Sequence, residues 1–123
     1  MKKFQATAIG AAILAGGLVA ATPSQAFDAD GNYMVNGSGQ STCSEWLIDR
    51  RIGDSGAWQL QQWVLGYLTA FNEFERGPGD IAEGLSAEGV FEWIDTYCGA
   101  SQAESVGEAA RALISARLAV LEQ

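Results

Sequence analysis

The stretch AWQLQQWVLGYLTAFNEFER, residues 57–76, carries the strongest helical pattern in this chain of 123 residues. Its large apolar residues recur at intervals of three and four, the spacing that gathers side chains on one face of a helix. They are Leu60, Trp63, Val64, Tyr67, Leu68, Phe71 and Phe74. Gly66 interrupts this helix, and we expect it to let another backbone approach closely. The following RGPGD ends the helix, because proline is not tolerated in a helix interior.

Two shorter helices are predicted on either side of this one. Thr42 and Glu45 match a capping box, which predicts a helix that runs to about Ile52, where GDSG ends it. Beyond the long helix, a second helix begins near Ser86 and has Gly99 as its C-terminal glycine. Its apolar side is formed by Val90, Phe91, Ile94, Tyr97 and Cys98.

The last predicted helix opens at SQAE, in which Ser101 and Glu104 match a second capping box, and it continues to about Leu121. No segment shows the strict apolar–polar alternation of a half-buried strand. The sequence therefore predicts an all-α fold, a small four-helix single domain.

Residues 1–26 have the layout of a secretory signal peptide: two lysines, an uncharged apolar run over 8–21, and small residues before a cleavage site. We place this cleavage after Ala26, with Ala21 as the alternative. The Ser-Gln-Ala ending argues against an uncleaved anchor. The chain is therefore predicted to be periplasmic, with no membrane contact after cleavage, because no second long apolar run follows.

Residues 27–40 are rich in Gly, Asn and Asp and have no apolar period, which predicts a flexible N-terminal arm. The DADGN stretch in it matches the opening of a calcium loop. However, Tyr33 and Gly39 stand at the sixth and twelfth places, where that loop needs Gly and Glu. We interpret the stretch as a turn and assign residues 41–123 to the helical domain.

The chain has two cysteines, Cys43 and Cys98, and no histidine. Two cysteines in an exported chain most simply pair with each other. A zinc site needs about four ligands, usually Cys and His, and neither cysteine belongs to a Cys-x-x-Cys redox motif. We therefore predict a structural disulfide from the first helix to the third, with no metal and no cofactor.

The charge of the exported chain excludes several functions. Removal of residues 1–26 leaves five arginines against fifteen acidic residues, a net charge of −10. Such a field repels nucleic acid and anionic lipid, and it favours basic partners. Without histidine, Ser-His and Cys-His catalysis are excluded. Carboxylate pairs such as Glu73 with Glu75, or Asp49 with Asp54, arise by chance in so acidic a chain, and we predict no enzymatic activity.

The four tryptophans are candidates for either core or partner contacts. Tryptophan is enriched at interface hot spots, but a small domain also needs large apolar side chains in its core. Trp63 is predicted to be core. Trp58 lies outside the main apolar face of the long helix and is the first candidate for a partner contact. Trp93 lies off the apolar line of its helix and is the second.

Several motifs together match a known family. Cys-x-x-Trp-Leu opens the first predicted helix, WVLGYLTAFN lies in the second, WIDTYC closes the third, and a capped fourth helix follows. Over residues 43–121 this pattern resembles the HdeA/HdeB-type periplasmic acid-stress chaperones, which are small exported four-helix proteins with one disulfide in this position. The chain is also similar to the Tai-type immunity proteins, which neutralise peptidoglycan amidase effectors of type VI secretion and are expected to carry further cysteines.

The resemblance to the chaperones implies a homodimer near neutral pH that loosens in acid and exposes apolar surface to unfolding periplasmic proteins. The candidate surface comes from the first two helices and includes Trp46, Leu47 and Val64. In strong acid the charge would change from −10 to about +5, because carboxylates become protonated. The alternative is an immunity or inhibitor protein that docks an acidic face and Trp58 onto one specific partner, a basic secreted cell-wall hydrolase. A structural role without a client is the third possibility.

Overall fold

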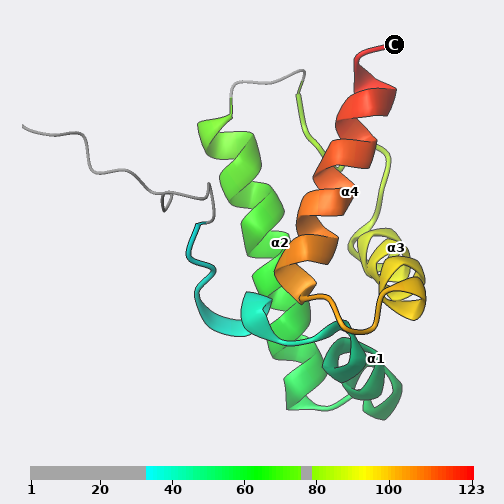
Figure 1. The fold of residues 1–123 in the computed structure, drawn as a ribbon. Coiled ribbons are helices and arrows are strands. Elements are labelled where there is room, and N and C mark those ends of the chain that lie inside the picture. The colour runs from blue at the N-terminus through cyan, green and yellow to red at the C-terminus, as the bar shows by residue number, and fades with distance from the viewer. Residues whose placement is uncertain (1–32, 76–78) are drawn as a thin grey trace, which may run out of the picture. The chain divides into compact units, whose positions relative to one another are not determined.

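Helices account for nearly all regular structure in the computed structural model, which describes residues 33–75 and 79–123 (Figure 1). These residues belong to one compact unit, Tyr33–Gln123. Its elements are η1 (Gly37–Gln40, a 3-10 helix), α1 (Cys43–Ile52), α2 (Ser55–Phe74), α3 (Ala87–Ala100) and α4 (Val106–Leu121). The prediction of an all-α fold with four packed helices is confirmed, and no strand occurs in the described part of the chain. The predicted signal peptide, arm residues 27–32 and the proline at position 78 lie outside the described residues.

Side-chain caps fix the start of the first two α-helices. The predicted capping box of α1 is present: Glu45 N–H donates to Thr42 Oγ1 at 3.2 Å, and the Glu45 carboxylate accepts from Thr42 N–H at 2.7 Å. Gly53 ends α1 with φ of 72°, in the left-handed region that favours glycine. The Asp54 carboxylate then accepts from Gly56 N–H at 2.9 Å and starts α2 at once.

The start of α4 differs from the prediction by one turn. Its capping box is formed by Ser105 and Glu108, not by Ser101 and Glu104. The reason is a tertiary contact, because the backbone carbonyl of Glu104 accepts a hydrogen bond from Cys43 N–H at 2.7 Å. Residues 101–105 are therefore held as a connection beside the start of α1, and the helix begins only after them.

The core lies between the four α-helices, and its buried hydrophobic members come from all of them and from the α2–α3 connection. The largest side chains with essentially no exposure are Trp46, Ile81, Ile94, Leu113, Val64, Val90 and Val106. The predicted disulfide is confirmed: Cys43 and Cys98 are joined at an S–S distance of 2.07 Å, and both are fully buried. The bridge ties the start of α1 to the end of α3.

The segment of residues 33–41, which we call the strap, is packed and does not form a free arm. Figure 1 shows it in cyan, running across α2 toward the start of α1. Trp63 Nε1–H on α2 donates to the carbonyl of Asn36 at 2.9 Å, and Val106 N–H on α4 donates to the carbonyl of Ser41 at 2.8 Å. The sequence of the strap has no apolar period, so its packing cannot be predicted from sequence. The strap contacts α2 and α4 largely through its backbone carbonyls.

Close backbone approach occurs at the strap and not at Gly66. Gly66 is exposed, and a Cβ placed there would meet no atom within 4 Å. At Gly39 a Cβ would lie 2.1 Å from the Trp63 ring, and at Gly107 it would lie 3.1 Å from the Gly39 carbonyl oxygen. Gly99 does not end α3 as predicted, because the helix continues to Ala100.

Candidate functional site

A cluster of charged side chains closes the contact between α1 and α3. Arg50, in the last turn of α1, forms a two-pronged ion pair with Asp95 of α3: Nε donates to Oδ1 at 3.0 Å and Nη2 to Oδ2 at 2.8 Å. Arg50 Nη2 also donates to Glu88 at 2.7 Å. Behind them, Trp46 Nε1–H donates to Asp95 Oδ1 at 2.7 Å. One carboxylate thus binds both a guanidinium and the largest core side chain.

Burial makes this cluster stronger than an ordinary surface pair. The side chain of Arg50 is 18% exposed and that of Asp95 is 32% exposed, whereas Glu88 is 61% exposed. Hydrogen bonds from Arg50 to Asp95 raise the pKa of the guanidinium well above its ordinary value, although burial works in the opposite direction. Within residues 33–75 and 79–123, the ion pairs to Asp95 and Glu88 are the two that occur, and both use Arg50.

An open hollow of about 460 Å³ lies beside this cluster and is lined by Leu47, Arg50, Arg51 and Asp95. The guanidinium of Arg50 also lies over the ring of Phe91, with its Cζ 5.6 Å from the ring centroid. The α1–α3 contact therefore has apolar side chains inside and a charged rim outside.

The structure places the predicted partner-binding residues in three different environments. Trp46 and Val64 have no exposed surface, so neither contacts a partner while the domain is folded as described. Packing is the reason, because Trp46 follows Cys43 by one turn and so faces the core beside the disulfide. Leu47 is partly buried at the hollow. Any role of Trp46 and Val64 in client binding thus requires the helices to separate.

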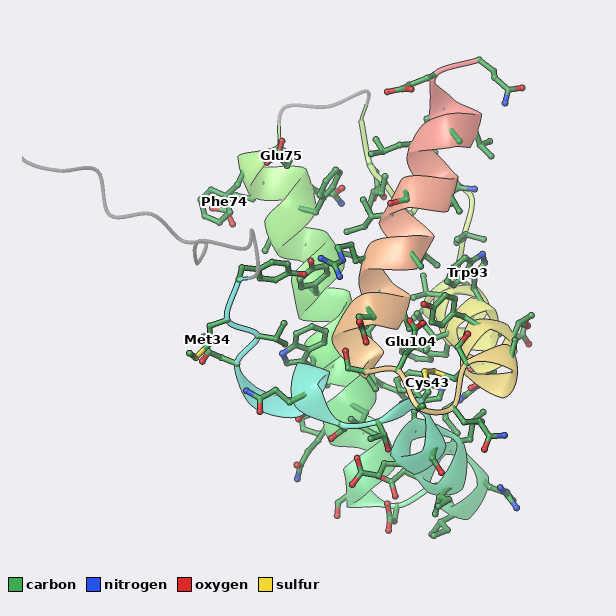
Figure 2. The ribbon with its side chains drawn as sticks, viewed as in Figure 1. Met34, Cys43, Phe74, Glu75, Trp93 and Glu104 are labelled. Atoms are coloured by element: carbon green, nitrogen blue, oxygen red, sulfur yellow. A yellow bond between two sulfur atoms is a disulfide. The ribbon has the colours of Figure 1, made fainter. Side chains whose placement is uncertain are left out.

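Trp58 is 62% exposed at the start of α2, as its position off the apolar face predicts. Trp93 is partly buried and stacks on Tyr97 with ring centroids 5.8 Å apart. Figure 2 shows it on α3. Phe74, predicted on the apolar face of α2, is 75% exposed because α2 ends there, beyond the core. Figure 2 shows both Phe74 and Met34 at the outside of the helices.

The two carboxylate pairs considered in the sequence lie near opposite ends of α2. The Asp49 and Asp54 carboxylates both lie near Gly56, where Asp54 caps α2. Glu73 and Glu75 are exposed at the C-terminal end of α2.

Among the residues that the structure describes, no group of three or more Asp, Glu, His or Cys side chains is arranged to hold a metal ion. Nor does any helix in that part of the chain have the length and apolar character needed to cross a membrane.

The sequence pattern does not reveal the Arg50–Asp95 cluster, because its members are 45 residues apart. The sequence does show that both residues are next to buried positions of their helices. Arg50 follows Trp46 by one helical turn, and Asp95 directly follows the buried Ile94. Both positions therefore border the buried faces of their helices.

Comparisons with models of protein families, with curated proteins and with solved structures find no match to this chain. The resemblance to the acid-stress chaperones and that to the immunity proteins therefore stay predictions, and function has to be argued from the residues themselves.

Proposed function

We propose that this protein is a non-enzymatic, acid-stress chaperone-like protein of the periplasm that exposes apolar surface to unfolding proteins at low pH. One observation carries the proposal: an apolar core is closed, at the α1–α3 contact, by ion pairs that depend on carboxylates. The export signal and the resemblance in motifs support the same function.

Acid has two effects on such a domain. Protonation of carboxylates removes the ion pairs of Arg50. It also leaves a net charge of about +5 on the arginines, which repel one another. Because each ion pair of Arg50 requires an ionised carboxylate, protonation of Asp95 and Glu88 removes an attraction that holds α1 to α3. Trp46 and the side chains around it would then be accessible to a client.

The disulfide keeps the loosened chain compact. Thiol–disulfide exchange requires a thiolate, which is scarce in acid, so the Cys43–Cys98 bridge persists where the ion pairs fail. The bridge keeps the start of α1 beside the end of α3 while the rest of α1 can move. Neutralisation then restores the ion pairs and allows the client to be released.

The direct test is the aggregation of a mixed periplasmic extract at about pH 2, below the ordinary pKa of carboxylates, with and without the oxidised protein. The proposal predicts fewer pelleted proteins when the protein is present. A sample with a reduced disulfide shows whether the bridge contributes, and an acid-stable protein of similar size controls for crowding. Equal pellets with and without the protein would exclude chaperone activity.

Size-exclusion chromatography at neutral pH tests the homodimer that the resemblance implies. Loss of the dimer on acidification would support a link between subunit separation and client binding. A monomer at every pH would remove the dimer from the proposal but leave the exposure of the core as its basis.

The exposure of Trp58 favours a second candidate, an immunity or inhibitor protein. Trp58 is 62% exposed at the start of α2, and the exported chain carries a net charge of −10, which suits a basic protein partner. This candidate predicts a tight one-to-one complex with a secreted cell-wall hydrolase and inhibition of that enzyme. Titration calorimetry would measure the complex, and Trp58→Ala should weaken it more than tenfold.

A further inference from the structure

The ion pairs of the described residues are concentrated at one place, the contact between α1 and α3. We propose that Arg50, Asp95 and Glu88 form an acid-sensitive latch, whose loss on acidification lets α1 separate from α3. This inference rests on the proposed function, because it names the contact that controls exposure of the core. It assigns to Asp95 the central part in the latch.

Asp95 is central because it receives four hydrogen bonds in this cluster. Arg50 Nε donates to Oδ1 at 3.0 Å and to Oδ2 at 3.2 Å, and Arg50 Nη2 donates to Oδ2 at 2.8 Å. Trp46 Nε1–H donates to Oδ1 at 2.7 Å. The residue thus ties the end of α1 and the buried Trp46 ring to α3 at once. Loss of its charge weakens every one of these contacts.

Protonation affects this cluster more than it affects an exposed pair. Hydrogen bonds between charged partners are roughly twice as strong as those between neutral groups. A proton on Asp95 also occupies an acceptor position, while Arg50 keeps its charge and is left partly buried without a full counter-ion. Arg51 lines the same hollow and adds repulsion once the carboxylates are neutral. The described residues of α2 and α4 contribute no charged side chain to the contacts of Arg50.

The strap responds differently to acid. Residues 33–41 carry no charge, and they are held by backbone hydrogen bonds, by the Trp63 ring and by the hydroxyl pair of Tyr33 and Tyr67 at 3.1 Å. Arg111 lies over the Tyr33 ring of the strap, with its Cζ 5.3 Å from the ring centroid, and an arginine keeps its charge in acid. Acid is therefore expected to open the α1–α3 contact and to leave the strap on α2 and α4.

The disulfide determines which part of α1 can move. Cys43 and Cys98 hold the first turn of α1 to the end of α3, whereas Arg50 lies in the last turn of α1. Release of the latch leaves the bridge as the covalent tie, so the C-terminal half of α1 separates first. This movement uncovers Phe91, over whose ring the Arg50 guanidinium lies, and so gives access to the adjacent Trp46 ring, whose centroid is 6.1 Å from that of Phe91.

The test compares how acidification changes the unfolding equilibrium constant of the oxidised protein, measured by urea titration at pH 7 and at pH 3. Asp95→Asn keeps an oxygen that accepts from Trp46 but removes the charge, so this variant should be less stable at pH 7. On acidification its equilibrium constant should rise by a smaller factor than that of the unmodified protein, because the charged pair with Arg50 is already absent at pH 7. Glu88→Gln, at the exposed side of the cluster, should have a smaller effect in the same direction.

Glu92→Gln is the matched control, because Glu92 is an exposed carboxylate on the same helix whose side chain joins no hydrogen bond or ion pair in the described residues. It should keep the acid response of the unmodified protein. If Asp95→Asn does not fold, Arg50→Gln replaces it. In that variant acid relieves repulsion between Asp95 and Glu88, so the acid-induced rise should also be smaller.

The outcomes separate the latch from the proposed function. If Asp95→Asn and Glu88→Gln respond to acid as the unmodified protein does, while that protein still exposes its core and protects clients, the latch is refuted and the function stands. If the unmodified protein opens in acid but protects no client, the proposed function fails and the latch survives. If the unmodified protein does not open at pH 3 or below, both are refuted.

Discussion

The contact between the strap and α2 can be tested at Gly39, a buried residue in η1. A Cβ at this position would lie 2.1, 2.4 and 2.6 Å from three atoms of the Trp63 ring, well inside any ordinary contact distance. The ring cannot turn aside without loss, because its Nε1–H bonds to the Asn36 carbonyl at 2.9 Å and its face stacks on Tyr67 at 5.1 Å. Gly39→Ala is therefore expected to overpack the contact and to lift the strap.

Overpacking of this kind typically costs about 1–3 kcal/mol, and a lost hydrogen bond adds about 1 kcal/mol. We expect Gly39→Ala to lower the free energy of unfolding by about 3 kcal/mol, which is roughly 12–24 °C in Tm for a domain of this size. Gly66→Ala is the matched control, because that glycine is exposed in α2 with no atom within 4 Å of a Cβ. It should raise the stability by up to about 1 kcal/mol.

Thermal unfolding followed by circular dichroism measures both variants under the same conditions. A Gly39→Ala variant as stable as the unmodified protein would refute the close packing of the strap on Trp63. A loss of stability in Gly66→Ala equal to that in Gly39→Ala would show that the effect does not come from this contact.

Three further predictions concern the bridge, the last helix and a half-buried tyrosine. Reduction of Cys43–Cys98, which closes a loop with a sequence separation of 55, should cost roughly 4 kcal/mol in guanidinium titrations, and unchanged stability would contradict a structural bridge. Ser105→Ala should cost about 1 kcal/mol and Ser101→Ala much less; equal losses in thermal melts would contradict the observed start of α4. Burial, and the hydroxyl pair with the strap, raise the pKa of Tyr67 to about 12, so its contribution to stability is complete below pH 10 and is lost as the pH rises through 12. A pH titration followed by absorbance at 295 nm measures tyrosine ionisation, and the step near pH 12 should be absent in Tyr67→Phe. Ionisation of Tyr67 near pH 10 in the folded protein would contradict the effect of burial on its pKa.

The long helix could be predicted from sequence because its apolar residues repeat over many turns. The helix begins at Ser55, two residues before the predicted Ala57. The reason is that α1 ends at Gly53 and the next residue, Asp54, already caps α2. The start of α4 was ambiguous in sequence, because both Ser101 with Glu104 and Ser105 with Glu108 have the capping-box spacing. Only the hydrogen bond between the start of α1 and the 101–105 connection decides between them.

The candidate site was less predictable than the fold. The pairing of Cys43 with Cys98 follows from cysteine number and export, whereas the pairing of Arg50 with Asp95 depends on how α1 crosses α3. The resemblance to the chaperones implies that Trp46 belongs to a client surface exposed in acid, and the described fold holds it fully buried in the core. Residue type alone does not distinguish these two environments.

The central claim is that acid exposes the core of an otherwise closed, disulfide-bonded domain. The most direct measurement is the fluorescence of an apolar dye mixed with the oxidised protein, titrated from pH 7 to pH 2, with near-ultraviolet circular dichroism of the tryptophans in parallel. The account predicts that dye fluorescence rises and the tryptophan signal falls below about pH 4, where carboxylates become protonated, and that both return on neutralisation. Dye fluorescence that stays at its neutral value down to pH 2, with an unchanged tryptophan signal, would contradict it.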